Sequence, residues 1–265
     1  MKILIFTDSR GQHKKKKSFK NKLIFTEKLK KELEKNKNNQ VNLILCPYKW
    51  TTTFDFIELC LNEIINVDDY DLIVLYTGIV EFSPRPMNQV INLLYNNNKN
   101  QTLTTDDILD NKKVGLVNKK KITIDKLIGE ENIKKYFNEP FSTKYKMEHT
   151  MNLLSVEMFE NKIIKWLKEN LGNKLIYINC NNIVKNWEGD YKNINAKGRP
   201  ANISLISNYS KITEKKLSKN IINLLEWTDE DIKKYTIDNM HLTYSGSEWI
   251  YNKLIDKIQE LATSE

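Results

Sequence analysis

Short apolar runs recur along the chain and predict the buried strands of a parallel sheet. Each of the four runs is almost wholly apolar and ends in polar or turn-forming residues, a pattern typical of strands that are covered on both faces. The runs are KILIFTD at 2–8, VNLILC at 41–46, DLIVLYTG at 71–78 and KLIYINC at 174–180. The longer stretches between them leave room for the crossover helices that parallel strands require.

Apolar positions at helical spacing predict helices between and after these strands. The pattern covers residues 18–37, 54–65 and 151–171. Gly172 follows the third of these stretches, where a left-handed cap is expected. A longer helix is predicted shortly after His241, with Ser245 and Glu248 in the positions of a capping box. Alternating strands and helices of this kind predict a doubly wound α/β sandwich.

A Lys- and Asn-rich stretch at 97–149 interrupts this alternation and carries no strong strand pattern. A structureless loop of that length is uncommon in a compact domain. We therefore expect a single domain over 1–265, with 97–149 as an inserted helical subdomain or flap that carries short helices around 105–111 and 124–137. Because the insertion comes soon after the third strand, it should lie over the carboxyl ends of the strands.

Polar and turn-forming residues collect where the predicted strands end. The four exits read TDSRG at 7–11, PYKWTTT at 47–53, TGIVEFSPRP at 77–86 and NCNNIVKNWEGD at 179–190. Ligands of doubly wound sheets bind beyond the carboxyl ends of the strands. These exits are therefore the predicted location of a functional site.

A serine, a histidine and an aspartate form the strongest set of candidate catalytic residues. The chain has three histidines, of which His13 lies in a basic run and His149 precedes a predicted helix, and we expect both to be structural or solvated. His241 follows Asp238 by three residues. A tight turn over that spacing brings a carboxylate to the imidazole Nδ1 and leaves Nε2 as a base. Ser9, at the end of the first strand, is the natural nucleophile for that base.

The order of TDSRG, TGIVE and DNMH along the chain resembles blocks I, III and V of the SGNH, or GDSL-type, hydrolases and acyltransferases. The resemblance covers most of the chain apart from 97–149, and it implies a three-layer α/β/α, flavodoxin-like sandwich with a mainly parallel sheet. Carried onto this sequence, it implies that Ser9 is the nucleophile, that His241 is the general base and then the acid, and that Asp238 orients the imidazole.

The chain departs from the family pattern in the groups that form the oxyanion hole. The family uses the N–H of the nucleophilic serine, a block II glycine N–H and a block III asparagine side chain. Val80 stands where the asparagine is expected, and CPYKWTTTFDF at 46–56 contains no glycine. The N–H of Ser9 is therefore the one donor that carries over directly. The candidate replacements, for oxyanion or substrate binding, are the amide of Gly78, a hydroxyl or amide from Thr51 to Thr53, and the guanidinium of Arg10 or Arg85.

Arg85 lies between Pro84 and Pro86, which restrict the backbone to a rigid turn. Two interpretations remain open. The residue is either a loop arginine that pairs with a surface carboxylate, or an anion clamp for a phosphate, carboxylate or sugar-acid group. Arg10 beside the nucleophile and Arg199 in NAKGRPANIS are further candidates for such a clamp.

Composition narrows the class of protein. With 265 residues, 40% hydrophobic residues, a mean hydropathy of -0.55 and no apolar run near 18 residues, we expect a globular protein with no membrane span. The net charge of +8 is spread through Lys/Asn-rich stretches without a nucleic-acid-binding motif, so no nucleic-acid partner is expected. The apolar run at 3–6 is too short for a signal peptide, which favours a cytoplasmic location. Three cysteines without ligand spacing predict buried thiols and no metal site.

The leading hypothesis is an O-acetyl transferase or O-acetyl esterase that acts on a polysaccharide or glycan precursor, as in polysaccharide biosynthesis, so the expected partner is a small-molecule or glycan substrate. Hydrolysis requires no cofactor, whereas acetyl-CoA is the candidate acyl donor for a transferase. The sequence leaves open whether water or a sugar hydroxyl accepts the acyl group, and it leaves the oligomeric state open. The alternative is a noncatalytic protein of the same fold that binds an anionic sugar. A phosphate-transfer enzyme that uses Asp8 is less favoured, because the chain has no Gly-rich phosphate loop and no carboxylate cluster for Mg²⁺.

Overall fold

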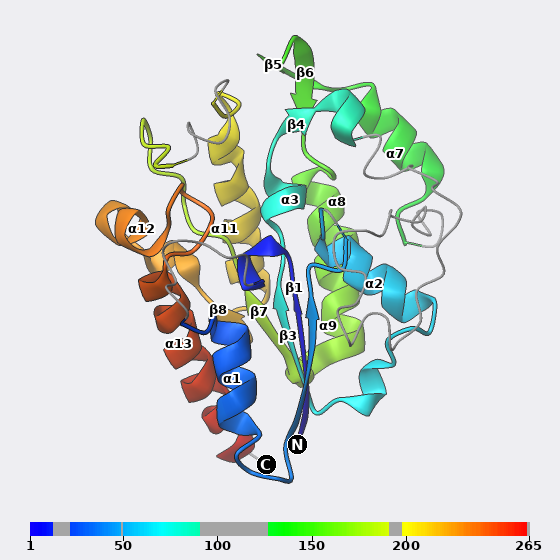
Figure 1. Cartoon of the computed structure of the whole chain (residues 1–265). Coiled ribbons are helices and arrows are strands. Elements are labelled where there is room, and N and C mark those ends of the chain that lie inside the picture. Colours follow the sequence, from blue (N-terminus) through cyan, green and yellow to red (C-terminus); the bar gives the residue numbers. More distant parts are fainter. Residues whose placement is uncertain (13–21, 49, 91–126, 191–197, 264–265) are drawn as a thin grey trace.

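Parallel strands form the central sheet of the computed structural model, which describes residues 1–12, 22–48, 50–90, 127–190 and 198–263. The strands are β1 (Lys2–Thr7), β2 (Gln40–Leu45), β3 (Leu72–Tyr76), β7 (Leu175–Ile178) and β8 (Ile221–Ile222). They lie in the order β2-β1-β3-β7-β8, and every neighbouring pair is parallel. The carboxyl ends of the strands therefore share one edge of the sheet, the upper edge in Figure 1.

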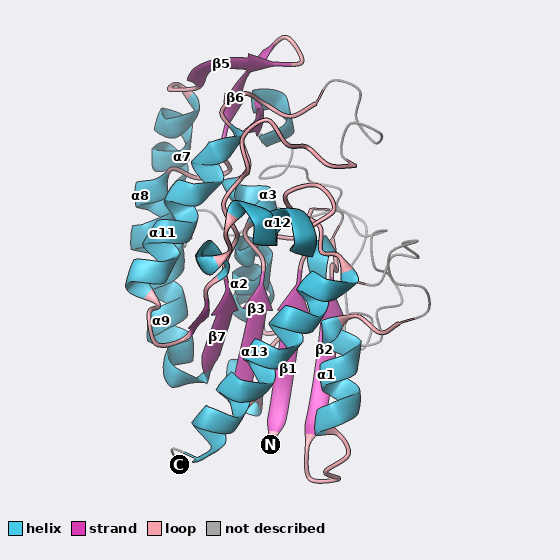
Figure 2. Ribbon diagram, turned by 90° about the vertical axis from the view of Figure 1, so that its left-hand side faces the viewer, coloured by secondary structure: helices cyan, strands magenta, loops and turns pink. Residues whose placement is uncertain are grey.

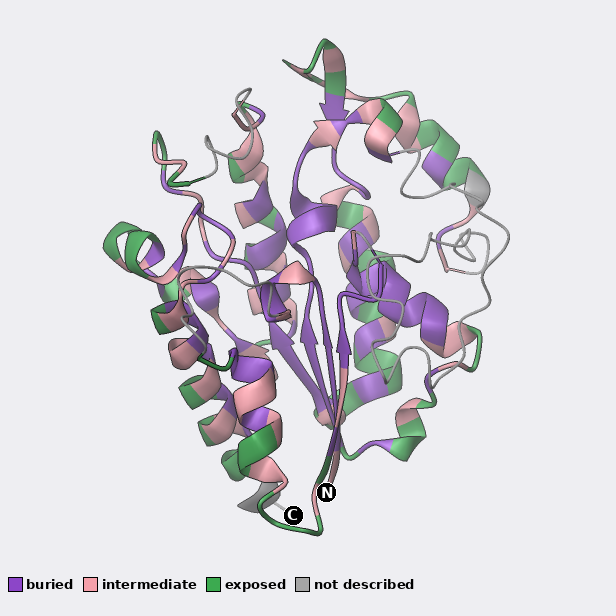
Figure 3. Cartoon of the chain, viewed as in Figure 1, coloured by how far each residue is buried: buried purple, intermediate pink, exposed green. Residues whose placement is uncertain are grey.

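Helices cover both faces of this sheet, so the predicted three-layer α/β fold is confirmed (Figures 1 and 2). One layer contains α1 (Phe25–Leu33), α12 (Asp229–Tyr235) and α13 (Tyr244–Thr263). The opposite layer contains α2 (Thr53–Leu61), α8 (Val156–Met158), a π-helix (Phe159–Ile164), α9 (Lys165–Leu171) and α11 (Ile206–Lys216). Alternation along β1 explains the two layers, because Ile3 and Ile5 pack into one core cluster and Leu4 and Phe6 into the other. Figure 3 shows the strands as the most deeply buried part of the chain.

The four predicted strands agree with the observed ones to within two residues at each end. The sequence pattern does not reveal β8, since two residues are too few to show a period. The predicted helices over 18–37 and 54–65 contain α1 and most of α2. Gly172 ends α9 as expected and has a positive φ of 52°, but its ψ of -126° lies outside the left-handed helical region, so the cap is not the predicted left-handed one.

The predicted helix over 151–171 is wrong at its start. Strand β6 (Glu148–Met151) occupies the first residue, and the helical segment begins only after Ser155. The hydroxyl of Ser155 accepts the N–H of Met158 (3.1 Å) and so caps this helix. Apolar spacing does not reveal the boundary, because the residues between the strand and the cap are buried as well.

The capping box predicted for the last helix is also wrong. The hydroxyl of Thr243 accepts the N–H of Gly246 (3.2 Å), so Thr243 is the cap and Ser245 lies exposed in the first turn. The carboxylate of Glu248 instead pairs with Lys28 on α1 (2.6 Å). A Cβ atom on Gly246 would lie 2.2 Å from the carbonyl oxygen of Tyr235, so this helix start requires glycine.

The described part of the insertion contains strands that the sequence pattern did not predict. Helix α7 (Glu130–Phe137) matches the second predicted helix in part, whereas the helix expected around 105–111 lies outside the described residues. After α7, β5 (Phe141–Tyr145) and β6 form a hairpin, and β4 (Arg85–Pro86) completes an antiparallel sheet in the order β4-β6-β5. The hairpin turn, Lys146–Met147, has a positive φ at both residues, as in a type I′ turn. This small sheet lies beyond the carboxyl ends of the parallel strands (Figure 1).

No helix in the described ranges has both the length and the apolar character needed to cross a lipid bilayer.

Replacing Thr243 with alanine should lower the free energy of unfolding by about 1 kcal/mol, because the N–H of Gly246 loses its acceptor. Replacing Ser245 with alanine is the matched control and should change stability by less than about 0.5 kcal/mol. Urea denaturation of both variants measures the difference. A larger loss from Ser245→Ala than from Thr243→Ala would restore Ser245 as the cap.

Candidate active site

A cleft of about 460 Å³ opens at the carboxyl ends of the strands, at the edge where the sequence predicts a functional site. Residues far apart in the sequence form its walls. They include Ser9, Trp50, Thr51, Val80, Arg85, Tyr145, Lys146, Arg199, Met240 and His241. The fourth strand exit, 179–190, contributes no lining residue, and the loop from Arg199 to Ile203 takes its place.

Ser9 lies half-buried on the cleft wall, directly after β1. It begins a 3-10 turn, Ser9–Gly11, in which the N–H of Gly11 donates to the carbonyl of Asp8 (3.1 Å). A Cβ atom on Gly11 would lie 2.3 Å from Thr7 Oγ1, so this glycine allows the turn to pack closely against the end of the strand. Within the described residues, neither the N–H nor the hydroxyl of Ser9 has a hydrogen-bond partner.

Asp238 and His241 make the contact that their spacing predicts. Asp238 Oδ2 lies 2.7 Å from His241 Nδ1, and Asp238 Oδ1 accepts the backbone N–H groups of Met240 (3.1 Å) and His241 (2.7 Å). The carboxylate is buried, whereas the imidazole lies one-third exposed on the cleft wall. Asn239 has a φ of 67°, and its side-chain oxygen accepts the N–H of Val184 (2.8 Å), which fixes the turn between them.

Arg199 is the third member of this group. Its Nη2 donates to the carbonyl oxygen of Asp238 and lies 3.4 Å from Asp238 Oδ2, and its side chain is almost fully buried. Burial alone would raise the pKa of Asp238, but the hydrogen bonds from His241 and the charges of His241 and Arg199 outweigh it, so the pKa lies below its ordinary value. Arg199 was expected to contribute to an anion clamp, and its guanidinium instead contacts the carboxylate that orients His241.

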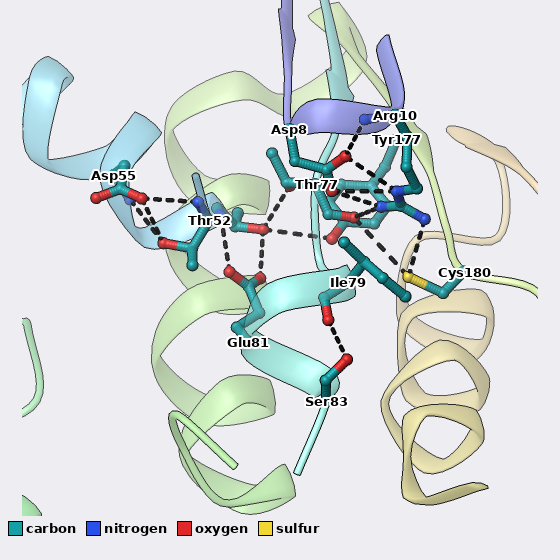
Figure 4. A network of polar contacts seen from close by, with 11 residues as sticks. Asp8, Arg10, Thr52, Asp55, Thr77, Ile79, Glu81, Ser83, Tyr177 and Cys180 are labelled. Atoms are coloured by element: carbon teal, nitrogen blue, oxygen red, sulfur yellow. Dashed lines mark hydrogen bonds and ion pairs between the residues drawn. The ribbon is translucent and has the colours of Figure 1, made fainter. Parts of the chain in front are cut away.

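Arg10 points into the protein and does not line the cleft (Figure 4). Its side chain is fully buried, with Nε and Nη2 within 3.1 Å of the Asp8 carboxylate and the guanidinium 4.0 Å from the centre of the Tyr76 ring. Its remaining donors reach the carbonyl of Thr77 (2.7 Å) and the sulfur of Cys180 (3.3 Å). The expectation that Arg10 binds substrate or an oxyanion is therefore not supported, because the guanidinium is enclosed on every side.

Burial and charge shift the pKa values of this inner cluster in opposite directions. Burial by itself would lower the pKa of Arg10, but the charge of Asp8 raises it well above the ordinary arginine value. Burial raises the pKa of the Cys180 thiol to about 11, despite the nearby positive charge. Cys180 is therefore a neutral thiol whose sulfur accepts a hydrogen bond from Arg10. The sequence predicts only a small buried apolar residue at this position.

A second polar cluster joins the exits of β2 and β3 (Figure 4). The carboxylate of Glu81 accepts both the N–H (2.7 Å) and the hydroxyl (2.5 Å) of Thr53, the first residue of α2. Thr53 Oγ1 also lies 2.7 Å from Thr77 Oγ1 and 3.3 Å from the hydroxyl of Tyr177. Glu81 belongs to the short helix α3 (Ile79–Phe82), so this cluster fixes α2 and α3 relative to each other.

The remaining oxyanion candidates differ in their access to the cleft. Thr51 lines it, but its hydroxyl donates to the carbonyl of Tyr48 (2.9 Å) and accepts the N–H of that residue (3.1 Å). No acceptor for the N–H of Thr51 is found in the described part of the chain. Gly78 does not line the cleft; its φ of 104° lets the chain turn from β3 into α3. Val80 does line it and presents an apolar side chain where the family has asparagine.

Two other described residues singled out in the sequence, His149 and Cys60, do not line the cleft. His13 lies outside the described residues, and His149 places its Nδ1 2.9 Å from the carbonyl of Phe141 in the hairpin. Burial raises the pKa of the Cys60 thiol well above its ordinary range. In the ranges that the structure describes, no three His, Cys, Asp or Glu side chains are grouped as a metal site would require.

Sequence reasoning missed several lining residues, namely Trp50, Tyr145, Lys146, Pro200, Ile203 and Met240. Tyr145 and Lys146 reach the cleft because the hairpin turns back over the strand exits. Met240 was within reach of sequence reasoning, since it lies inside the DNMH motif. Trp50 was also within reach, since it lies in the predicted strand exit at 47–53. Tyr145, Lys146, Pro200 and Ile203 carry no local signal, because their place in the cleft depends on how distant loops pack.

The sequence matches no protein-family model and no curated protein. It is similar in structure to a lipase/acylhydrolase from Enterococcus faecalis, with a TM-score of 0.50 and 12% identity over 98% of this chain and 95% of the other. An acetyl xylan esterase matches with a TM-score of 0.45 and 14% identity, over 97% and 98% of the two chains. A lipase from a goat rumen metagenome matches at 0.41 and 14%, over 97% of each chain. The first similarity, together with the parallel sheet and its layers, shows an SGNH/GDSL-type fold.

Replacing Arg10 with alanine should lower the free energy of unfolding by about 3–5 kcal/mol, because the buried Asp8 carboxylate loses its partner. Chemical denaturation at neutral pH measures this loss. Lys165→Ala, which breaks an exposed pair with Glu169, is the matched control and should cost less than about 1 kcal/mol. Equal losses in the two variants would contradict the structural role assigned to Arg10.

Proposed function

We propose that the protein catalyses serine-dependent acyl transfer on a carbohydrate, as an O-acetyl esterase or O-acetyltransferase. Ser9 is the nucleophile, His241 the general base and then acid, and Asp238 the group that orients the imidazole. The observation that carries the proposal is the 2.7 Å contact between Asp238 Oδ2 and His241 Nδ1, made on the wall of the cleft that Ser9 also lines. The SGNH/GDSL-type fold supports the same assignment, since it is shared with a lipase/acylhydrolase.

The tautomer of His241 follows from its partner. The Nδ1–H group of His241 donates a hydrogen bond to the ionised Asp238, so the neutral imidazole carries its free lone pair on Nε2. Nε2 can then accept the hydroxyl proton of Ser9 while Oγ attacks the ester carbonyl. The imidazolium returns that proton to the leaving group, which is the sugar oxygen of an ester in an esterase or the sulfur of a thioester donor in a transferase, and an acyl group remains on Ser9. Water releases the acyl group in an esterase, whereas a sugar hydroxyl accepts it in a transferase.

Arg199 helps to fix the carboxylate that orients His241. Because the guanidinium lies 3.4 Å from the same oxygen that contacts His241 Nδ1, part of the negative charge of Asp238 is compensated before His241 gains a proton. Together with the hydrogen bonds from His241, the charge of Arg199 lowers the pKa of Asp238 and keeps the carboxylate ionised. Arg199 is therefore a positioning residue in the proposed mechanism.

The oxyanion hole in this proposal consists of the N–H groups of Ser9 and Thr51. Both residues line the cleft, and neither N–H has an acceptor in the described ranges of the chain. Val80 offers no donor where the family has an asparagine. Loss of one such donor lowers the rate by about 10²–10³-fold. We therefore expect turnover to depend on a well-activated ester or on binding energy from the rest of the substrate.

The assignment of a carbohydrate substrate rests on the aromatic side chains of the cleft. Trp50 and Tyr145 line it together with polar groups, a combination suited to the apolar faces and hydroxyl edges of a sugar. In a transferase, acetyl-CoA would be the acyl donor. The alternative function, noncatalytic binding of a sugar, would use the same walls and is separated from catalysis by the experiment that follows.

Ser9→Ala should lower the rate of hydrolysis of 4-nitrophenyl acetate by at least about 10³-fold, because the acyl-enzyme cannot form. Ser83→Ala is the matched control. Ser83 also lines the cleft, but its hydroxyl donates to the carbonyl of Ile79, so this variant should retain most of the activity. Circular dichroism establishes that both variants are folded. Equal activity in Ser9→Ala and the parent would exclude Ser9 as the nucleophile, and an inactive parent that binds sugars would favour the noncatalytic alternative.

A further inference from the structure

The charged residues that line the cleft are all basic. They are Arg85, Lys146 and Arg199, and no carboxylate is among the lining residues that the structure describes. The guanidinium of Arg199 contacts Asp238, which is buried behind the wall, so the charges of these two residues compensate each other. Arg85 and Lys146 also lie on the cleft wall, and positively charged side chains in such a position attract anionic ligands.

Arg85 is held rigidly at the cleft wall. Its backbone belongs to β4, where it pairs with Met151 of β6, and prolines flank it on both sides. Its Nε donates to the carbonyl of Val80 (3.1 Å), which holds the half-buried guanidinium beside the block III position. A fixed guanidinium loses little conformational entropy when it binds a carboxylate or phosphate, and its planar donors match both groups.

Lys146 reaches the cleft from the tip of the β5–β6 hairpin, and that hairpin is anchored on both sides. The hydroxyl of Tyr145 donates to the carbonyl of Gly198 (2.7 Å), and the side-chain amide of Asn202 donates to Thr150 Oγ1 (3.0 Å). These bonds join the hairpin to the loop that carries Arg199. The exposed Lys146 side chain is therefore attached to a defined backbone at the mouth of the cleft.

We propose that Arg85 and Lys146 form an anion subsite, so that the acyl-bearing substrate is an acidic sugar that carries a carboxylate or a phosphate. This inference rests on the proposed function and specifies the substrate class of the same cleft. Arg85 makes the directional, paired contact with the anionic group, whereas Lys146 adds a mobile charge at the mouth. The two residues come from different elements, β4 and the hairpin turn, and the antiparallel sheet brings those elements to one cleft.

The test compares two substrates that differ at one carboxyl group, which is charged in an O-acetylated galacturonic acid and neutral in its uronate methyl ester, and it measures the release of acetate from each. We expect the parent to prefer the acid in kcat/KM. Arg85→Gln should reduce the ratio of kcat/KM values, acid over ester, by about 10- to 100-fold, mostly through the KM of the acid. Arg85→Lys should restore part of this ratio, and Lys146→Gln should lower it by a smaller factor. An unchanged ratio in both Gln variants would overturn the subsite.

Lys144→Gln is the matched control for charge alone. It removes one positive charge from the same hairpin, but Lys144 lies exposed on β5 and does not line the cleft. This variant should leave the ratio unchanged. If Lys144→Gln lowers the ratio as much as Lys146→Gln does, long-range attraction accounts for the preference and the proposed contact with Lys146 is wrong.

A binding measurement separates failure of the subsite from failure of the proposed function. Calorimetric titration of Ser9→Ala with glucuronate, glucose 1-phosphate and glucose requires no turnover. Binding of either acidic sugar that weakens about tenfold or more in Ser9→Ala/Arg85→Gln supports the subsite even if no ester is cleaved. The stronger of the two acidic ligands identifies the anionic group as carboxylate or phosphate. Equal binding of all three sugars overturns the subsite and leaves the hydrolytic proposal standing.

Discussion

The ion pair between Asp8 and Arg10 is the interaction on which the geometry of the strand exits depends. A fully buried guanidinium is costly to remove from water, and here a bidentate carboxylate, a carbonyl, a thiol sulfur and the face of Tyr76 surround it. These partners come from β1, β3 and the segment after β7, so one side chain joins three neighbouring strands where they end. Ser9 lies between the two members of the pair. Its position on the cleft wall is therefore set by groups that never face the cleft.

The same principle applies on the other side of the site. The carboxylate of Glu81 accepts hydrogen bonds from both the N–H and the hydroxyl of Thr53, the first residue of α2. The side chain of Thr77 connects this cluster to the exit of β3. Thr51, two residues before α2, and Val80, in α3, are held by these contacts at the cleft wall. The candidate reactive groups are thus held in place by buried polar side chains.

Sequence reasoning was most successful where the physics is local. Apolar runs reveal the strands, because parallel strands are buried on both faces, and the three-residue spacing of Asp238 and His241 leads to the contact that the structure contains. It was least successful where the role of a residue depends on contacts with residues far away in the sequence. Arg10 resembles a substrate ligand in the sequence, yet Tyr76 and Cys180 enclose it. Arg199 reaches Asp238 across 39 positions, and the hairpin enters the cleft through pairing with the two residues of β4. No period or motif encodes these contacts.

The central claim is that Ser9 carries the acyl group, and peptide mapping of the acylated protein tests it most directly. The protein is mixed briefly with an activated acetyl ester, quenched in acid and digested, and the peptides are analysed by mass spectrometry. The account predicts a single acetyl group on Ser9, formed rapidly by the parent and much more slowly by His241→Ala, in which no base accepts the hydroxyl proton. Acetylation of lysines alone, at equal rates in the two proteins, would contradict the account.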